Sequence, residues 1–169
     1  MRNIILIGMP GAGKSTVGVI LAKTLGINFM DTDIVIQQRT GELLCKTLER
    51  VGVEGLLDEE EKAIKSLDLS GCRCVVATGG SAVLRKASME HLKKNGVCVY
   101  LRLPYSVISK RVNNRSTRGI AAEKHESLRQ IYEYRAPYYE KYADFVVDCK
   151  GRSVEKNVAE ILRVLIGIE

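Results

Sequence analysis

The chain has 169 residues, of which 46% are hydrophobic and 27% are charged, a composition typical of a single globular domain that spans residues 1–169. No segment approaches the roughly 18 consecutive apolar residues that a membrane span needs, so we expect no membrane partner. The net charge of +6 favours anionic ligands, but its lysines and arginines are scattered among acids, which fits a small anion and not a nucleic acid.

The first predicted element is a strand over residues 2–8, RNIILIG, which is apolar almost without interruption. Such a run is typical of a strand covered on both faces of a parallel sheet. A glycine loop and Lys14 follow it, without the small-residue cleavage site of a secretory signal. We therefore expect a cytoplasmic protein.

The segment GMPGAGKST, residues 8–16, matches the phosphate-binding pattern GxxxxGK[ST]. Glycines let backbone N–H groups turn toward phosphate oxygens, and the helix predicted over 14–26 directs its positive end at the same anion. Lys14 would reach the β- and γ-phosphates, and Ser15 would bind Mg²⁺. The nucleotide-binding residues predicted from this loop are Gly11, Ala12, Gly13, Lys14, Ser15 and Thr16.

Two acids end the next predicted strand, in INFMDTD over residues 27–33. Ligands of open α/β sheets collect at the carboxyl ends of strands, and Asp31 and Asp33 stand at such an end. One acid can support a magnesium ion while the other takes the proton of an acceptor hydroxyl. One of them can also cap the helix that begins near Ile34.

Further apolar runs predict strands over 72–80, 96–103 and 144–149, and helical spacing occupies 61–69, 87–96, 106–112, 126–143 and 153–167. Alternating strands and helices indicate a three-layer α/β fold with a parallel sheet. Gly79 and Gly80 end the third strand, where they allow a ligand to approach closely. The polar segment at about 113–125 is predicted to be a mobile lid.

Five cysteines, an odd number without CxxC spacing, lie in or beside apolar segments. This pattern predicts buried thiols and not a metal site. Cys72 and Cys74 are the only close pair, and no histidine lies near them in the sequence.

The phosphate loop is followed, in this order, by FMDTDIVIQQRTG, TGGSAV, an arginine-bearing lid and YRAPYYEKYAD. This order of motifs resembles the shikimate kinase family of P-loop folds over essentially the whole chain. The resemblance implies a P-loop NTPase fold with the sheet order 2-3-1-4-5, an acceptor-binding region at about 33–62, and the substrates ATP and shikimate with Mg²⁺. It also implies a monomeric small-molecule kinase that makes shikimate 3-phosphate for aromatic amino acid biosynthesis.

The resemblance further assigns roles to individual residues. Asp31 would assist the metal with Ser15, and Asp33 would bind the acceptor and act as the base, with Lys14 and the lid residue Arg118 as its catalytic partners. Arg135 would hold the carboxylate of the acceptor beside Gly79 and Gly80. Arg111 and Arg152 would lie near the adenine.

The chain departs from the family pattern at the acceptor site. Shikimate kinases generally carry a second carboxylate-binding arginine in a segment resembling GExxFRxxE, and Leu57 stands at or near its place in GVEGLLDEEE. Loss of that partner should cost about 1.5–3 kcal/mol, unless Lys62 or Arg50 turns inward. The neighbouring acids Asp58, Glu59 and Glu60 would weaken binding further if any of them faced the pocket. Ser81 replaces the third glycine of the strand-end run, and Gly119 replaces the proline that commonly follows the lid arginine.

Three other functions stay open from these residues. A kinase of the same fold could act on a different small alcohol, since the second arginine is missing. A non-catalytic nucleotide-binding regulatory module is a further alternative, although such a module has little need of Asp33 as a base. Phosphorylation of nucleic-acid ends would need a basic groove, which the sequence does not show.

Overall fold

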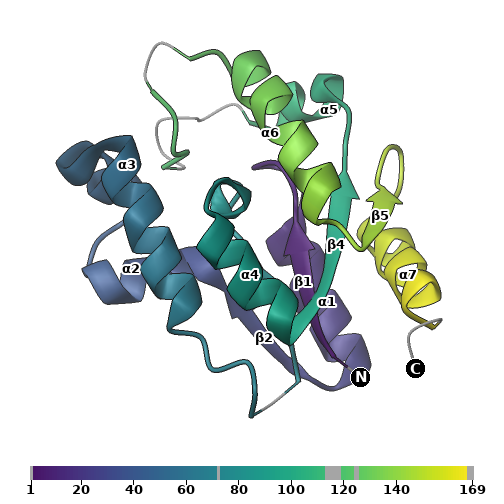
Figure 1. Ribbon diagram of the computed structural model, residues 1–169. Coiled ribbons are helices and arrows are strands. Elements are labelled where there is room, and N and C mark those ends of the chain that lie inside the picture. Colours follow the sequence, from purple (N-terminus) through teal and green to yellow (C-terminus); the bar gives the residue numbers. More distant parts are fainter. Residues whose placement is uncertain (1, 72, 113–118, 124–125, 167–169) are drawn as a thin grey trace.

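The computed structural model describes residues 2–71, 73–112, 119–123 and 126–166. Their centre is a five-stranded parallel sheet in the order β2-β3-β1-β4-β5, which confirms the predicted fold class and strand order (Figure 1). The strands are β1 (Asn3–Ile7), β2 (Asn28–Asp31), β3 (Cys74–Ala77), β4 (Gly96–Arg102) and β5 (Phe145–Asp148).

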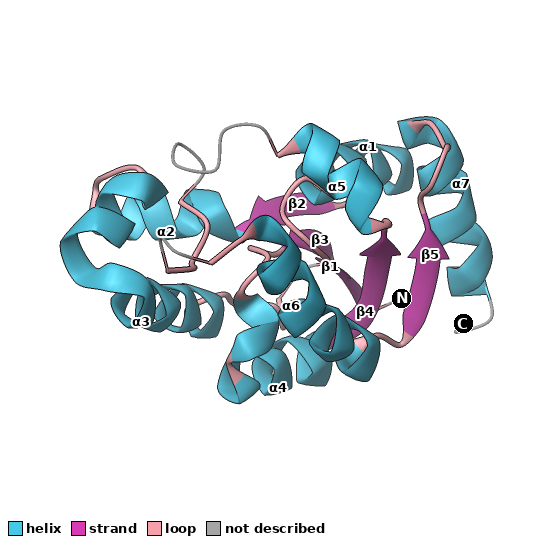
Figure 2. Cartoon of the chain, turned by 90° about the horizontal axis from the view of Figure 1, so that it is seen from above, coloured by secondary structure: helices cyan, strands magenta, loops and turns pink. Residues whose placement is uncertain are grey.

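Helices cover both faces of this sheet, as the alternating pattern predicts. Figure 2 shows α1 and α7 on one side and α4 and α6 on the other. The helices are α1 (Lys14–Leu25), α2 (Thr32–Thr40), α3 (Leu44–Lys65), the 3₁₀ turn η1 (Ala82–Leu84), α4 (Lys86–Asn95), α5 (Tyr105–Arg111), α6 (Leu128–Tyr142) and α7 (Val154–Leu165).

The core follows from the apolar strands. Every residue of β1 and β3 is buried, as are the first six of β4, because helices pack on both of their faces. Asn3 is the polar exception in β1, and it joins three segments at the amino end of the sheet: its Nδ2 donates to the carbonyls of Leu69 and Asn95, and its Oδ1 accepts from the amide of Cys74. These hydrogen bonds lie at the amino end of the sheet. They therefore do not occupy the carboxyl end, where ligands of such sheets bind.

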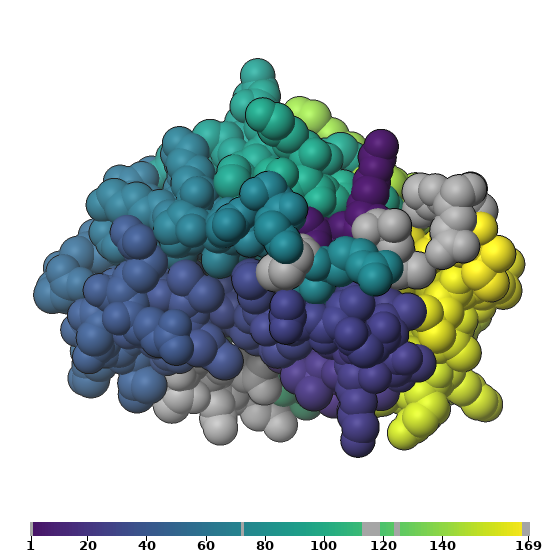
Figure 3. All heavy atoms as spheres, turned by 90° about the horizontal axis from the view of Figure 1, so that it is seen from below, coloured from purple at the N-terminus to yellow at the C-terminus, as the bar shows by residue number. Residues whose placement is uncertain are grey.

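The region between β2 and β3 differs most from the prediction. The expected helix over 61–69 is the end of a much longer α3, which begins at Leu44 and stops at Lys65. Gly52 has φ 70° and ψ −175°, so it interrupts the helical backbone and divides α3 into two parts. Figure 3 shows that α2 and α3, in blue, lie at the opposite end of the molecule from α7, in yellow.

The thiols of Cys74, Cys98 and Cys149 are buried, whereas Cys45 at the start of α3 is partly exposed. Burial raises the pKa of Cys98 to about 12 and that of Cys149 to about 11. Cys72 lies outside the described residues. In the described ranges, no helix combines the length and the apolar character needed to span a bilayer.

Candidate active site

A cavity of about 520 Å³ opens at the carboxyl ends of the strands, which point upward in Figure 1. It joins the phosphate loop after β1 to the strand end after β3 and to the inner side of α6. Its lining residues are Pro10, Gly11, Gly13, Lys14, Ser15, Thr16, Asp33, Leu44, Thr78, Gly79, Gly80, Ser81, Arg111, Gly119, Ile120, Ala121 and Arg135. Most residues predicted for nucleotide and acceptor binding thus surround one space.

Lys14 lies inside the phosphate loop with only 7% of its surface exposed. Its Nζ donates hydrogen bonds to the carbonyls of Gly8 at 2.7 Å and Met9 at 2.9 Å. Gly11 and Gly13 have φ angles of 81° and 92°, which the loop needs to curve around an anion and which other residues rarely adopt. Burial lowers the pKa of Lys14 to about 8, although Asp33 and Asp31 oppose that shift.

Ser15 and Asp31 form the part of the site that suits a metal ion. Ser15 Oγ donates to Asp31 Oδ2 at 2.6 Å, while Asp31 Oδ1 accepts from the amide of Asp33 at 3.0 Å and caps α2. A hydroxyl and a carboxylate side by side are the hard oxygen donors that Mg²⁺ prefers. This pair therefore fits the predicted magnesium site, and Asp31 is also the helix cap that the sequence allowed for one of the two acids.

Asp33 follows in the first turn of α2 and lines the cavity. Burial raises the pKa of its carboxyl to about 6, the nearby Asp31 adds to this rise, and Lys14 opposes it. A carboxylate with a pKa near the working pH is a good acceptor for the proton of a hydroxyl. The position and the pKa of Asp33 thus suit the predicted base.

Two hydrogen bonds hold the glycines at the end of β3. The amide of Gly79 donates to Thr32 Oγ1 at 2.9 Å, and Tyr139 Oη donates to the carbonyl of Gly80 at 2.5 Å. A Cβ on Gly79 would lie 2.9 Å from Asp33 Oδ1 and even closer to Glu60 Oε1, so a larger residue there would displace both carboxylates. The sequence analysis did not identify Tyr139, although its i, i+4 spacing from Arg135 on a helix was a usable signal.

Arg135 lines the cavity from α6 and is itself only 2% exposed. Its guanidinium donates to the carbonyl of Ala121 at 2.6 Å and also bonds to Tyr139. A buried arginine held in one orientation is well suited to bind a carboxylate with two hydrogen bonds. The geometry is consistent with the predicted role of Arg135.

Leu57, at the place of the second arginine, does not line the cavity. It belongs to a small apolar cluster with Ile36, Leu56, Ala63 and Ala121. The neighbouring buried group on α3 is Glu60, which accepts a hydrogen bond from Ser81 Oγ at 2.6 Å. Of the three acids that follow Leu57, Glu60 is therefore the one that reaches the acceptor end, whereas Asp58 and Glu59 form ion pairs with Arg85 and Lys62.

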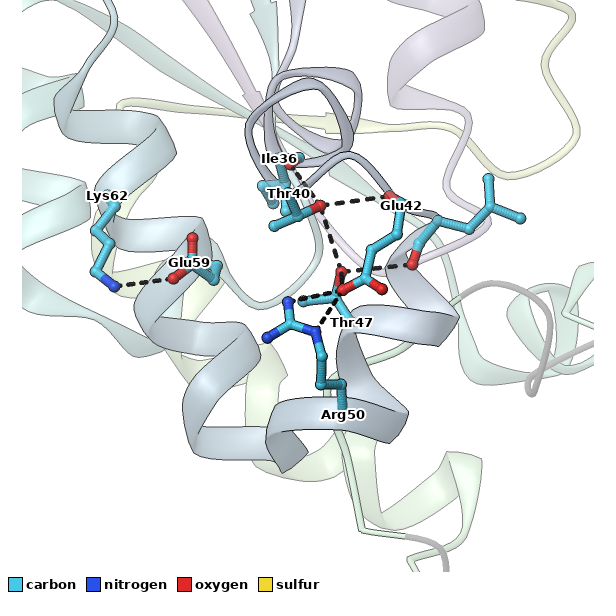
Figure 4. Close-up of polar contacts among 8 residues, drawn as sticks. Ile36, Thr40, Glu42, Thr47, Arg50, Glu59 and Lys62 are labelled. Atoms are coloured by element: carbon cyan, nitrogen blue, oxygen red, sulfur yellow. Dashed lines mark hydrogen bonds and ion pairs between the residues drawn. The ribbon is translucent and has the colours of Figure 1, made fainter.

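The suggestion that Arg50 or Lys62 turns inward is wrong. Figure 4 shows Arg50 paired with Glu42 and Lys62 paired with Glu59. Their closest contacts are 2.7 Å and 2.8 Å, and both side chains are more than half exposed. Each cation stays outside the acceptor end because a surface acid within reach holds it there.

The remaining predicted residues lie at the edges of the site or outside the described chain. Arg111 Nη1 donates to the carbonyl of Gly11 at 3.3 Å, on the cavity wall. Arg152 follows β5 and lies 3.6 Å from Glu160 of α7. Ala12 is buried within the phosphate loop, and its amide donates to the carbonyl of Met9. Arg118 lies outside the described residues, so its predicted role in the lid stays a prediction.

The lid segment is described only at residues 119–123. Gly119 has a φ of 60°, an angle that the ring of proline cannot adopt, which explains why this chain does not carry the proline at that position. A Cβ on Gly119 would lie 2.7 Å from the amide nitrogen of Cys45. This end of the segment therefore packs directly on the start of α3.

Comparisons with known proteins agree with the fold described above. The family model described as shikimate kinase matches residues 10–166. The shikimate kinase of Thermodesulfovibrio yellowstonii is 38% identical over 96% of this chain and 94% of its own length, and that of Thiobacillus denitrificans is 40% identical over 98% and 88%. The solved structure of shikimate kinase from Acinetobacter baumannii in complex with shikimate has a TM-score of 0.91 and 30% identity, covering 99% of this chain and 94% of that one.

Proposed function

The chain belongs to the shikimate kinase family, and from that premise we propose that it transfers the γ-phosphate of ATP to a hydroxyl of shikimate. This reaction forms shikimate 3-phosphate, an intermediate of aromatic amino acid biosynthesis. The observation that carries the proposal is the single cavity into which Lys14, Asp33 and Arg135 all face. A phosphate-binding lysine, a base and a carboxylate-binding arginine are the three groups that this transfer needs.

In the proposed reaction, Arg135 binds the carboxylate of shikimate and thereby directs the opposite side of its ring at Asp33. The Asp33 carboxylate accepts the proton of the reacting hydroxyl as the hydroxyl oxygen forms its bond to the γ-phosphorus. The bond from that phosphorus to the β,γ-bridging oxygen breaks, and ADP leaves with the electron pair. Lys14 and the amides of the phosphate loop stabilise the negative charge on the phosphate oxygens throughout.

Magnesium has a place in this scheme beside the phosphates. Ser15 and Asp31 would hold the ion. Among the described residues, no group of three or more acidic, histidine or cysteine side chains could enclose it. Mg²⁺ usually retains several waters and binds substrate phosphates together with one or two protein ligands. When bound, it would neutralise charge on the β- and γ-phosphates.

The alternatives are less well supported than a shikimate kinase. A regulatory module would not require Asp33 and Arg135 to meet in one cavity with the phosphate loop. The close relatives over nearly the whole chain favour shikimate over another alcohol. We further propose that the protein acts as a monomer, because the phosphate loop, Asp33 and Arg135 of one chain already surround one cavity, and light scattering after gel filtration tests the oligomeric state. We also propose a cytoplasmic location.

A coupled assay of ADP release tests the proposed reaction. The purified protein is supplied with ATP, Mg²⁺ and either shikimate or one of a panel of small alcohols. We expect turnover with shikimate and its loss in a Lys14→Met variant purified in parallel, which controls for contaminating kinases. Turnover with another alcohol and none with shikimate would contradict the assignment of the acceptor, and nucleotide binding without any turnover would contradict the assignment as an enzyme.

A further inference from the structure

Glu60 is a buried acid at the acceptor end that the proposed mechanism does not use. Only 3% of its surface is exposed, and it lies on the buried side of α3 with Leu56, Leu57, Ala63 and Ile64. Its Oε2 accepts a hydrogen bond from Ser81 Oγ, and its Oε1 lies directly over the Cα of Gly79. Because Gly79 and Ser81 both line the cavity, this carboxylate lies directly behind the wall against which an acceptor would pack.

The charged groups that face Glu60 come from three other elements. They are Asp33 of α2, Arg135 of α6 and Lys14 of α1. On α3 itself, Asp58, Glu59 and Glu61 pair with Arg85, Lys62 and Lys65 at the surface, and Leu57 is apolar. Lys14 points at the phosphate loop, and its effect on Glu60 is smaller than that of Arg135, so among the described residues Arg135 is the main cation that balances Glu60.

Arg135 thus interacts electrostatically with two negative groups when an acid binds. One is Glu60, which belongs to the protein, and the other is the carboxylate of the acceptor. A second arginine at the position of Leu57 would have relieved this competition, but the apolar side chain there cannot. Ser81 compensates only in part, since its hydroxyl satisfies one oxygen of Glu60 without supplying a positive charge.

We propose that Glu60, held in place by Ser81, is a specificity-determining residue that shares Arg135 with the acceptor and so limits how strongly the pocket prefers an anionic acceptor over a neutral one of the same shape. This inference rests on the proposed function, because it takes shikimate as the anionic acceptor. It predicts that the negative charge of Glu60 weakens the binding of the shikimate carboxylate without affecting the ring hydroxyls in the same way.

The electrostatics of the pocket support this inference. Burial raises the pKa of Glu60 to about 7, and Asp33 adds to the rise, whereas Ser81, Arg135 and Lys14 oppose it. The carboxyl therefore changes its charge near neutral pH and is mostly ionised at pH 8. The carboxyl group of the acceptor is ionised throughout this range, so a change in affinity between pH 6 and pH 8 would originate in the protein.

The experiment compares shikimate with its methyl ester, which has the same ring hydroxyls but no charge. The measured quantity is the ratio of kcat/KM for shikimate to kcat/KM for the ester at pH 8. In Glu60→Gln, which keeps the shape of the side chain and can still accept from Ser81, we expect this ratio to rise by at least about tenfold through a lower KM for shikimate. A hydrogen bond that Glu60→Gln loses with both acceptors lowers kcat/KM for both of them and therefore cancels in the ratio.

Glu61→Gln is the matched control, because it removes the same charge one residue further along α3, where the side chain is partly exposed and paired with Lys65. We expect it to change the ratio by less than about twofold, since solvent screens this pair. A second measurement needs no variant: the ratio for the unmodified protein should fall between pH 6 and pH 8. Asp33, whose pKa is about 6, also gains charge at the lower end of this range, so the same pH series is measured on Glu60→Gln, where the fall of the ratio should be smaller.

The outcomes separate the inference from the function on which it rests. Turnover of shikimate with equal ratios in Glu60→Gln and Glu61→Gln, or a ratio that does not change with pH, would overturn the role of Glu60 and leave the kinase assignment intact. Failure to turn over shikimate at any pH would overturn both. A rise of the ratio in Glu60→Gln alone, together with its fall with pH in the unmodified protein, would support the inference.

Discussion

The hydroxyl of Ser15 lies 2.6 Å from Oδ2 of Asp31, and the same carboxylate caps α2 through its other oxygen. Asparagine caps a helix about as well as aspartate does, so Asp31→Asn removes a negative charge beside the proposed magnesium site with little effect on the helix. We expect the Mg²⁺ concentration at half-maximal activity to rise by about 10- to 100-fold. Titration of activity with Mg²⁺ at saturating ATP and shikimate checks this, and an unchanged requirement would exclude Asp31 from the metal site.

Lys14 is predicted to be needed for transfer and not for folding. The variant Lys14→Met keeps the length of the side chain and removes the buried charge, so kcat should fall by at least about 10²- to 10³-fold. Its thermal midpoint should be equal to or higher than that of the unmodified protein, because no charge then remains in the buried position. Steady-state kinetics and thermal unfolding monitored by circular dichroism measure the two effects, and loss of activity caused by unfolding would contradict the prediction.

Arg135 is expected to bind the acceptor through its planar guanidinium. Arg135→Lys retains the charge but loses the paired hydrogen bonds, so the KM for shikimate should rise by roughly 10- to 150-fold, while the KM for ATP changes little. Arg129→Lys is the control, since Arg129 lies on the same helix, is exposed and stacks over the ring of Tyr105. Equal effects of the two substitutions would mean that Arg135 does not contact the acceptor.

Tyr139 should act as a positioning residue through its bond to the carbonyl of Gly80. Tyr139→Phe leaves that carbonyl without its donor and should raise the KM for shikimate by about fivefold to tenfold, with a smaller change in kcat. Tyr138→Phe serves as the control, because Tyr138 is the preceding residue and its ring contacts Tyr134. A loss of thermal stability without any change in the KM for shikimate would assign Tyr139 to the core alone.

The stability of the protein should depend on pH through Glu60. Its pKa is raised from 4.5 to about 7 in the folded state, so the folded protein keeps a proton that the unfolded chain loses. The ionisation of Glu60 therefore lowers the free energy of unfolding as the pH rises from 4.5 to 7, by at most about 3 kcal/mol.

Urea denaturation of the unmodified protein and of Glu60→Gln, at pH values between 5 and 8, measures this dependence. Glu60→Gln should gain in relative stability up to about pH 7 and keep a constant advantage above it. A difference between the two proteins that is independent of pH would show that Glu60 has the same charge in the folded and unfolded states across this range.

Much of the fold could be predicted because its signals are local. The strands β1 and β4 are continuous apolar runs, and α1 begins at the phosphate loop and ends at Gly26, whose left-handed conformation stops the helix. The order of the strands came from the resemblance, since periodicity alone does not say which strands are neighbours. The helix α2 was predicted only as a helix that begins near Ile34, and its end at Gly41 was not given. The first part of α3 was not predicted, because Gly52 interrupts the helical backbone there.

The acceptor site was only partly predictable for a different reason. Asp33 and Arg135 stand in recognisable motifs, whereas the partnership of Glu60 with Ser81 depends on how α3 packs against the end of β3. One signal was present in the sequence: Glu60 follows Leu56 and Leu57 at helical spacing and so lies on their apolar face. A carboxylate on such a face indicates either a buried partner or a site, but only the tertiary structure identifies the partner.

The burial of the thiols has a practical consequence for studying this enzyme. A thiol with a pKa of about 11 or 12 contains almost no thiolate at neutral pH, so Cys98 and Cys149 should react with maleimides far more slowly than Cys45. Once Cys72 is replaced by serine, Cys45 becomes the preferred attachment point for a fluorophore. Because its backbone lies beside Gly119 at the rim of the cavity, the emission of that dye would follow ligand binding without any engineered label site.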